Sequence, residues 1–187
     1  MLREVNQIPG IKVIVAKHFA DERGFLLQSW VRQDLEAAGI PSDFKQAIQT
    51  CSKRGVVRGL HFQWDPPMGK FVRCIYGAII DVVVDVRHGS PTLGDHAAVE
   101  LSGQNHKVIW VPPGFAHGTV ALEDHSIVLY ECTSEHGPGR EGGILWNDPA
   151  LGIKWPDISP IVSQKDKEAP TLQQWLADPR SQHFRFA

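Results

Sequence analysis

The sequence predicts an all-β fold, a sandwich or jelly roll with short flanking helices, on three observations. Short runs rich in β-branched and aromatic residues recur along the chain without long helical patterns between them. Turn signals such as Gly89-Ser90-Pro91 and Pro112-Pro113-Gly114 separate these runs. The 17 glycines and 13 prolines among 187 residues also favour turns over long helices. Strands at this spacing are typical of sandwiches and jelly rolls.

Eight segments have the composition of strands: residues 12–16, 25–30, 71–76, 78–86, 97–101, 107–111, 118–122 and 127–132. A short helix is predicted at 32–38, because good helix formers there are followed by Gly39-Ile40-Pro41, a stop signal. A second is predicted at 170–177, which begins with proline and has Leu172 and Trp175 on one face. The length fits one domain, so we expect residues 1–187 to form a single jelly-roll domain with a C-terminal helix and tail from about residue 170.

Composition and charge exclude several classes of protein. Lys and Arg total 19 against 21 Asp and Glu, a net charge of −2, which argues against a dedicated nucleic-acid binder. The most apolar stretch, 74–86, is interrupted by Asp81 and Asp85, so no membrane span is expected. Cys51, Cys74 and Cys132 are far apart and resemble reduced thiols. With no targeting segment visible, we expect a cytoplasmic protein.

Segment 79–86 carries two carboxylates on one face. A period of two places Asp81 and Asp85 on the same side, with Ile79 and Val83, and the other valines opposite. Because an unpaired buried charge is costly, we expect this face to be partly solvated or to meet an arginine.

The densest group of reactive side chains is Arg58-Gly59-Leu60-His61-Phe62-Gln63, followed by Lys70. On a regular strand, Arg58 and His61 project to opposite sides unless a bulge or twist intervenes. Histidine is the natural general base near neutral pH, although a structural histidine explains the local pattern equally well.

A second group ends in Pro112-Pro113-Gly114-Phe115-Ala116-His117, where a tight turn delivers His117 at the start of a strand. Two histidines raise the question of a metal. Metal cupins present a His-x-His pair with a following Glu, but position 59 here is Gly and position 63 is Gln. Two good ligands make a weak transition-metal site, so no metal or other cofactor is expected.

Two further residues have ordinary explanations when taken alone. Tyr130 is one of two tyrosines, and a strand aromatic with a solvent-exposed hydroxyl accounts for it. Asp166, after Ser163-Gln164-Lys165, resembles a surface carboxylate. The common dinucleotide, NTPase, hydrolase and zincin motifs are absent from the sequence.

Together, six motifs in order resemble the dTDP-4-dehydrorhamnose 3,5-epimerase family. They are Val57–Gln63 as VRGLHFQ, 70–74 as KFVRC, 81–92 as DVVVDVRHGSPT, 113–118 as PGFAHG, 146–149 as WNDP and 163–166 as SQKD. The resemblance spans about residues 10–172. It implies a cupin-type jelly roll (a double-stranded β-helix), a homodimer without metal, and a nucleotide-diphosphate 4-keto-6-deoxy sugar as substrate.

The resemblance also implies roles for individual residues. A ketone at C4 acidifies the hydrogens on C3 and C5, so a base and an acid on opposite faces can invert either centre through an enolate. Four residues match the catalytic groups: His61 the base, Asp166 its partner, Lys70 the cation near the enolate oxygen, and Tyr130 the acid. Six match substrate-binding positions: Arg23, Gln28, Gln46, Arg58, His117 and His136.

The sequence departs from the family pattern at three places. Gln28 stands where the family usually has Glu, Ala47-Ile48 replace Asp-Asn, and Glu135-His136 replace a pair of aromatics. Because these positions shape the nucleotide and sugar sites, we hypothesise that the enzyme inverts one centre or uses a carrier other than dTDP. Two other functions remain open: a related 3,4-ketoisomerase using the same enolate chemistry, and a non-catalytic sugar-binding cupin.

Overall fold

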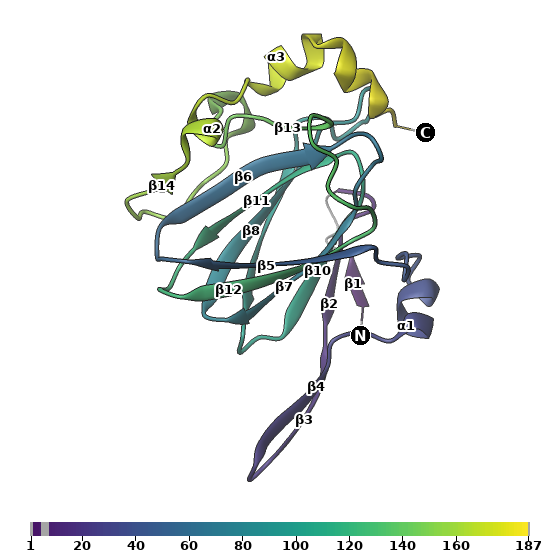
Figure 1. The fold of residues 1–187 in the computed structure, drawn as a ribbon, viewed down its shortest axis with the longest axis vertical. Helices are drawn as coiled ribbons and strands as arrows, with labels where there is room; N and C mark the ends of the chain where they lie inside the picture. The colour runs from purple at the N-terminus through teal and green to yellow at the C-terminus, as the bar shows by residue number, and fades with distance from the viewer. Residues whose placement is uncertain (1, 5–7, 187) are drawn as a thin grey trace.

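The computed structural model describes residues 2–4 and 8–186 and contains two facing β-sheets (Figure 1). The first sheet has the spatial order β1 (Leu2–Glu4), β2 (Lys12–Val15), β10 (Lys107–Val111), β7 (Lys70–Tyr76), β12 (Ser126–Cys132) and β5 (Gln46–Ser52). The second has the order β13 (Glu141–Gly143), β6 (Val56–Gln63), β11 (Phe115–Ala121), β8 (Ala78–Asp85) and β9 (His96–Ser102), with β14 (Ile161–Val162) parallel to β6. All other pairings are antiparallel, and the predicted all-β class is confirmed.

Five short helical segments complete the described chain: α1 (Arg32–Ala37), η1 (Pro149–Leu151), α2 (Gln164–Lys167), α3 (Leu172–Ala177) and η2 (Pro179–His183). Helix α1 ends within one residue of the prediction. Helix α3 begins two residues after Pro170, because the Thr171 side chain caps its first turn and forms a capping box with Gln174. The described residues contain no helix long and apolar enough to cross a membrane.

Both faces of β8 and β11, at the centre of the second sheet, are buried, which explains the apolar character of β8. Ile79 and Val83 pack between the two sheets against Val72 and Ile109 of the first. On the outer face, a second cluster joins the sheet to the C-terminal segment: Leu60, Phe62, Trp64, Val82, Val84, Val86, Ala116, Ile144, Leu151, Leu172, Trp175 and Phe184. Helix α3 therefore covers the sheet with the apolar face that the sequence predicts for it.

The two carboxylates of β8 lie inside the molecule. Asp81 and Asp85 are fully buried, so the expectation of a partly solvated face is wrong. The expectation that this face contacts an arginine is confirmed for Asp85, because Arg87 Nη2 lies 2.7 Å from Asp85 Oδ2. Burial would raise the pKa of Asp85, but hydrogen bonds from Arg87, Ser90 and Thr92 hold it below its usual range.

Two strands on the predicted list differ clearly from the structure, and six strands of the described chain are absent from that list, among them β1, β6, β13 and β14. Strand β11 begins at Phe115, three residues before the predicted start, and the segment predicted at 25–30 is β4 (Gly24–Gln28). Its partner β3 (Lys17–Asp21) and the edge strand β5 were not predicted. Strands β3 and β5 are largely exposed and polar, so they lack the alternation that marks a half-buried strand.

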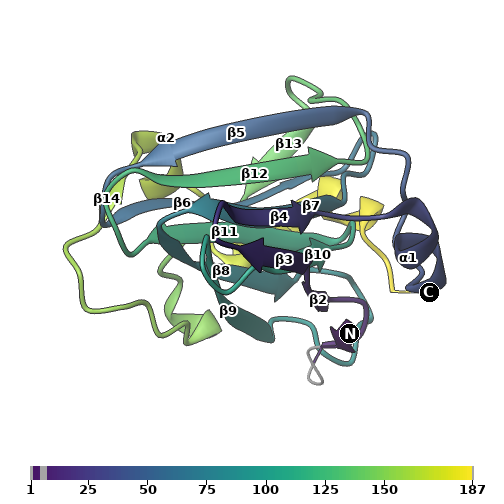
Figure 2. The same cartoon turned by 90° about the horizontal axis from the view of Figure 1, so that it is seen from below.

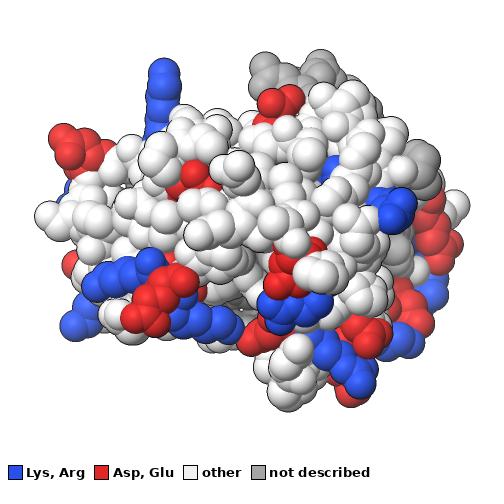
Figure 3. All heavy atoms as spheres, turned by 90° about the horizontal axis from the view of Figure 1, so that it is seen from above, with Lys and Arg blue, Asp and Glu red and all other residues white. Residues whose placement is uncertain are grey.

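The hairpin β3–β4 projects away from both sheets (Figure 1), and Figure 2 shows it from below the strands. Every residue of β3 is exposed. At the opposite end of the molecule, Lys and Arg side chains lie among Asp and Glu side chains around a largely uncharged centre (Figure 3). That face therefore carries mixed charge. The hairpin extends beyond the sheets and contacts its own chain through His18 and Phe25, whose rings lie against that of His106.

Candidate active site

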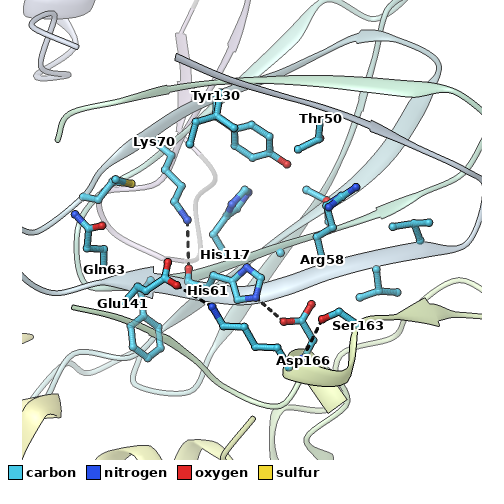
Figure 4. A pocket seen from close by; sticks show the side chains of 18 of the residues that line it. Thr50, Arg58, His61, Gln63, Lys70, His117, Tyr130, Glu141, Ser163 and Asp166 are labelled. Atoms are coloured by element: carbon cyan, nitrogen blue, oxygen red, sulfur yellow. Dashed lines mark hydrogen bonds and ion pairs between the residues drawn. The ribbon is translucent and has the colours of Figure 1, made fainter. Parts of the chain in front are cut away.

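A cavity of about 510 Å³ opens between the two sheets, within the ~300–1,000 Å³ range of small-molecule sites. Seven of the ten residues selected from the sequence line it: Arg58, His61, Lys70, His117, Tyr130, His136 and Asp166. Figure 4 shows His61 and Asp166 on one side, Tyr130 and Thr50 on the other, and Lys70 and His117 between them. Residues from both sheets and from α2 therefore converge on one space.

Arg58 and His61 face the same cavity, which a regular strand does not allow. His117 of β11 pairs with His61, while Thr119 pairs with Arg58, so β6 carries one extra residue over this step. Gly59 lies within this bulge at φ +134°, and a Cβ there would come within 2.5 Å of Gly118 Cα. The bulge anticipated as the exception is present, and it resets the alternation so that both side chains line the cavity.

His61 is bonded to a carboxylate. Its Nε2 lies 2.6 Å from Asp166 Oδ1, and the Asp166 side chain is 6% exposed, so the local interpretation of Asp166 as a surface residue is wrong. Burial would raise the pKa of Asp166, but hydrogen bonds from His61, Gly59 and Ser163 hold it below its usual range. An ionised Asp166 accepts a hydrogen from Nε2, which leaves Nδ1 of the neutral imidazole with the lone pair of a base.

Lys70 carries its ammonium into the cavity from β7. Burial lowers the pKa of Lys70, and the nearby Cys132, Asp81 and Glu141 oppose that effect. Its Nζ donates a long hydrogen bond of 3.4 Å to the carbonyl of His61. A cation in this position is suited to an anionic oxygen placed beside His61.

Tyr130 reaches the cavity from β12, in the sheet opposite His61. Burial and the charge of Asp81 raise the pKa of Tyr130 to about 12, against the opposing effect of the Thr50 and Thr119 hydroxyls. The phenol is therefore protonated near neutral pH and can donate its hydrogen. Its ring meets the His117 ring edge-on at 6.0 Å between centroids.

His117 is also bonded to a carboxylate. Its Nε2 lies 2.8 Å from Asp81 Oδ2, and both side chains are buried. His117 is therefore the partner of the buried Asp81 carboxylate, and the strand pattern did not identify it. Among the described residues, no group of three His, Cys, Asp or Glu side chains is placed to hold a metal ion.

Three predicted binding residues lie outside the cavity of their own chain. Arg23 and Gln28 belong to the projecting hairpin, where Arg23 bonds to Asp21. Gln46 contributes indirectly, because its Oε1 accepts the backbone N–H of His136 at 2.9 Å. The structure thus assembles the catalytic set within one chain but leaves the hairpin residues apart from it.

Two charged residues that line the cavity, Glu141 and Lys165, were not selected as site residues from the sequence. Glu141 Oε2 lies 2.8 Å from His136 Nε2, and Glu141 Oε1 accepts a hydrogen bond from Lys165 at the same distance. Lys165 directly precedes Asp166 on α2, so its proximity to a selected residue was a usable signal. Nothing in the local sequence marks Glu141, which the pairing of β13 with β6 brings to the site.

Comparison with known proteins gives a consistent result. Residues 5–174 match the family model described as dTDP-4-dehydrorhamnose 3,5-epimerase. The chain is 45% identical over 172 residues to the dTDP-4-dehydrorhamnose 3,5-epimerase of Salmonella typhimurium, an alignment that covers 90% of this chain and 94% of that protein.

Solved structures agree with the sequence comparison. A dTDP-6-deoxy-D-glucose-3,5-epimerase from Legionella pneumophila, in complex with dTDP-4-keto-L-rhamnose, superposes with a TM-score of 0.93 at 38% identity, covering 100% of both chains. A 3′-monoepimerase from Streptomyces bikiniensis, in complex with dTDP-quinovose, gives 0.87 at 33% identity, covering 91% of this chain and 88% of that one. The structural match therefore includes an enzyme named for two centres and one named for a single centre.

Proposed function

The chain belongs to the dTDP-4-dehydrorhamnose 3,5-epimerase family, and on that premise we propose how its own residues act on a nucleotide-linked 4-keto-6-deoxy sugar. It is a carbohydrate epimerase, an isomerase with a cupin jelly-roll fold, that inverts C3, C5 or both. The observation that carries the assignment of residues is the His61–Asp166 pair, which faces Tyr130 across the cavity.

The proposed reaction follows from the positions of these groups. His61 removes a proton from the carbon next to the C4 ketone, and the electron pair moves to O4. The Lys70 ammonium stabilises the enolate oxygen, because a fixed charge is effective in a site sheltered from water. Tyr130 returns a proton from the opposite face, so the centre inverts. The Asp166 carboxylate stabilises the imidazolium that forms on His61.

The polar groups around the catalytic set are proposed to bind the substrate. Arg58 lines the cavity, and its Nε bonds to Ser52, which leaves other guanidinium hydrogens for the diphosphate. His117 and His136 line the sugar end, each bonded to a carboxylate. Because His136 replaces a family aromatic, we propose that this end decides whether a second centre is inverted.

The function is tested by incubating the protein with dTDP-4-keto-6-deoxy-D-glucose in deuterium oxide and following the sugar by NMR. An epimerase replaces hydrogen by deuterium at C3, C5 or both and inverts the exchanged centre. Movement of the carbonyl would instead identify a 3,4-ketoisomerase, and binding without exchange a non-catalytic sugar-binding protein. Inversion at both centres would contradict the hypothesis that the departures restrict the reaction to one.

We also propose a homodimer in which the hairpin of each copy reaches the cavity of the other. Phe19, Phe25 and Leu26 on this hairpin are 63%, 61% and 65% exposed, an apolar surface typical of an interface. Arg23 and Gln28 on the same hairpin lie away from their own cavity. A two-fold arrangement would cover the apolar side chains and bring both polar residues to the partner's nucleotide.

Two variants of the hairpin separate assembly from binding. The Phe19→Asp/Leu26→Asp variant is expected to sediment as a monomer, because two charges replace exposed apolar side chains at the interface. Arg23→Ala is expected to remain a dimer while KM rises ~10-fold or more, the usual effect of losing a charge-assisted hydrogen bond. A wild-type protein that sediments as a monomer would contradict the proposal.

A cytoplasmic location is proposed on the state of the cysteines. The thiols of Cys51, Cys74 and Cys132 are all free. Burial raises the pKa of Cys74 to about 11, which keeps that thiol protonated and unreactive. Free thiols are typical of a reducing compartment.

A further inference from the structure

The one-turn helix α2 is attached to the second sheet by two consecutive side chains. Asp166 bonds to His61 on β6, and Lys165 Nζ donates to Glu141 Oε1 on β13 at 2.8 Å. The two strands are paired neighbours, with Gly143 of β13 opposite His61. Adjacent residues of α2 therefore bond to adjacent strands. Two bonds fix the orientation of the helix relative to the sheet, whereas a single bond would allow the helix to rotate.

Glu141 is held in place from a second direction. Its Oε2 lies 2.8 Å from His136 Nε2, on the loop between β12 and β13. Burial would raise the pKa of Glu141, but the bonds to Lys165 and His136 outweigh it and hold the pKa below its usual range. Glu141 is therefore ionised with both oxygens engaged, which restricts its rotamer.

Helix α2 has little intrinsic stability of its own. It contains four residues, and an isolated helix of this length does not form in water. Ser163 caps its first turn, and the preceding β14 contributes two residues to the sheet. The orientation of the Asp166 carboxylate thus depends on the side-chain bonds that the helix forms after its N-cap, including the bond from Lys165 to Glu141.

We infer that Glu141 is a positioning residue for the catalytic pair: through Lys165 it sets the orientation of α2, and so the contact between Asp166 and His61. The inference rests on the proposed function of His61 as the base. Because the Lys165 side chain is 66% exposed, the bond contributes little to folding stability. Its effect is on geometry, where a misplacement of about 1 Å costs up to ~10²-fold in rate.

A direct electrostatic effect on His61 predicts a different outcome for Lys165. The charged side chains that line the cavity are Arg58, Lys70, Glu141, Lys165 and Asp166. Removing the positive charge of Lys165 would by itself favour the imidazolium and move the titration of His61 to higher pH. Loosening the Asp166 contact withdraws stabilisation from the imidazolium and moves the titration to lower pH. The sign of the shift in Lys165→Met therefore separates the two effects.

The experiment compares Glu141→Gln, Lys165→Met and the double variant with Lys167→Met. Lys167 lies on the same helix beside Asp166, so its variant removes the same charge at a similar place without breaking the bond to Glu141. Each protein is assayed for kcat and KM, and the ring signal of His61 is titrated by NMR without substrate. We expect Glu141→Gln and Lys165→Met to lower kcat ~10-fold with KM little changed, and to move the His61 titration to lower pH.

The double variant is expected to have the kcat of the less active single variant, because both substitutions remove the same bond between Glu141 and Lys165. Lys167→Met is expected to keep kcat and to show no shift to lower pH. A shift to higher pH in Lys165→Met, an effect on KM alone, or additive losses in the double variant would each overturn the inference. If Lys165→Met unfolds, Lys165→Ala takes its place, because it removes the same positive charge and the same bond to Glu141 and so keeps the two signs distinct. Because the titration needs no substrate, a wild-type protein inactive on the sugar would refute the proposed function and leave this measurement intact.

Discussion

Replacing His61 with alanine is expected to abolish deuterium exchange at the epimerised carbon and to lower kcat/KM by ~10²–10⁴ or more, the usual contribution of a general base. The imidazole Nε2 is engaged by Asp166 at 2.6 Å, so removal of the ring deletes the base and leaves a buried carboxylate facing the empty space. Asp166→Asn is expected to be damaging too, because the imidazole loses its orienting charge. NMR of the sugar in deuterium oxide measures both variants.

The matched control for this variant is His183→Ala, which removes an exposed imidazole from η2, outside the cavity. It should keep exchange and inversion at the wild-type rate. The His61 side chain is 38% exposed, so its removal should leave the fold intact, as a melting curve would establish. Near-normal exchange in a folded His61→Ala protein would refute the assignment of the base.

The Tyr130→Phe variant is expected to exchange without inverting. His61, Asp166 and Lys70 remain, so the enolate still forms, and the imidazolium returns a solvent-derived deuteron to the face from which the proton left. The sugar should therefore gain deuterium with retained configuration, while inversion nearly stops for lack of a donor on the far face. The pKa of about 12 keeps the wild-type phenol protonated and ready to donate.

The chain supplies its own control, since Tyr76 is its other tyrosine and is 60% exposed. Tyr76→Phe removes an identical hydroxyl and should leave inversion unchanged. If Tyr130→Phe inverted the centre at the wild-type rate, another group in the cavity would be the acid, and His136 would be the first to examine.

Most strands could be predicted because apolar residues recur in them at the spacing of a buried strand face. β7, β8, β9, β10 and β12 each bury at least one face and agree with the prediction to within a residue or two. β3 and β5 could not be predicted in this way, because an exposed strand needs no apolar face. Their pairing is recognisable only beside β4 and β12, which share their backbone hydrogen bonds.

The candidate site divides along a similar line. His61, Lys70 and Tyr130 were selected through the resemblance to a known family, and the structure places all three in one cavity. Local pattern alone assigned Asp166 to the surface, because the feature that buries it is a bond to a histidine 105 residues away. Glu141 had no sequence signal, since its place depends on the register of β13 against β6.

The sequence by itself determined the all-β class, the two predicted helices that correspond to α1 and α3, and the identity of the reactive groups. These features depend on local propensity, periodicity and residue type. Only the tertiary structure decided which groups meet. The bulge at Gly59 turns Arg58 and His61 to one face, and β8 brings Asp81 against His117. These contacts join residues distant in sequence, and hydrogen bonds between buried charges form only where packing excludes water and holds both partners in place.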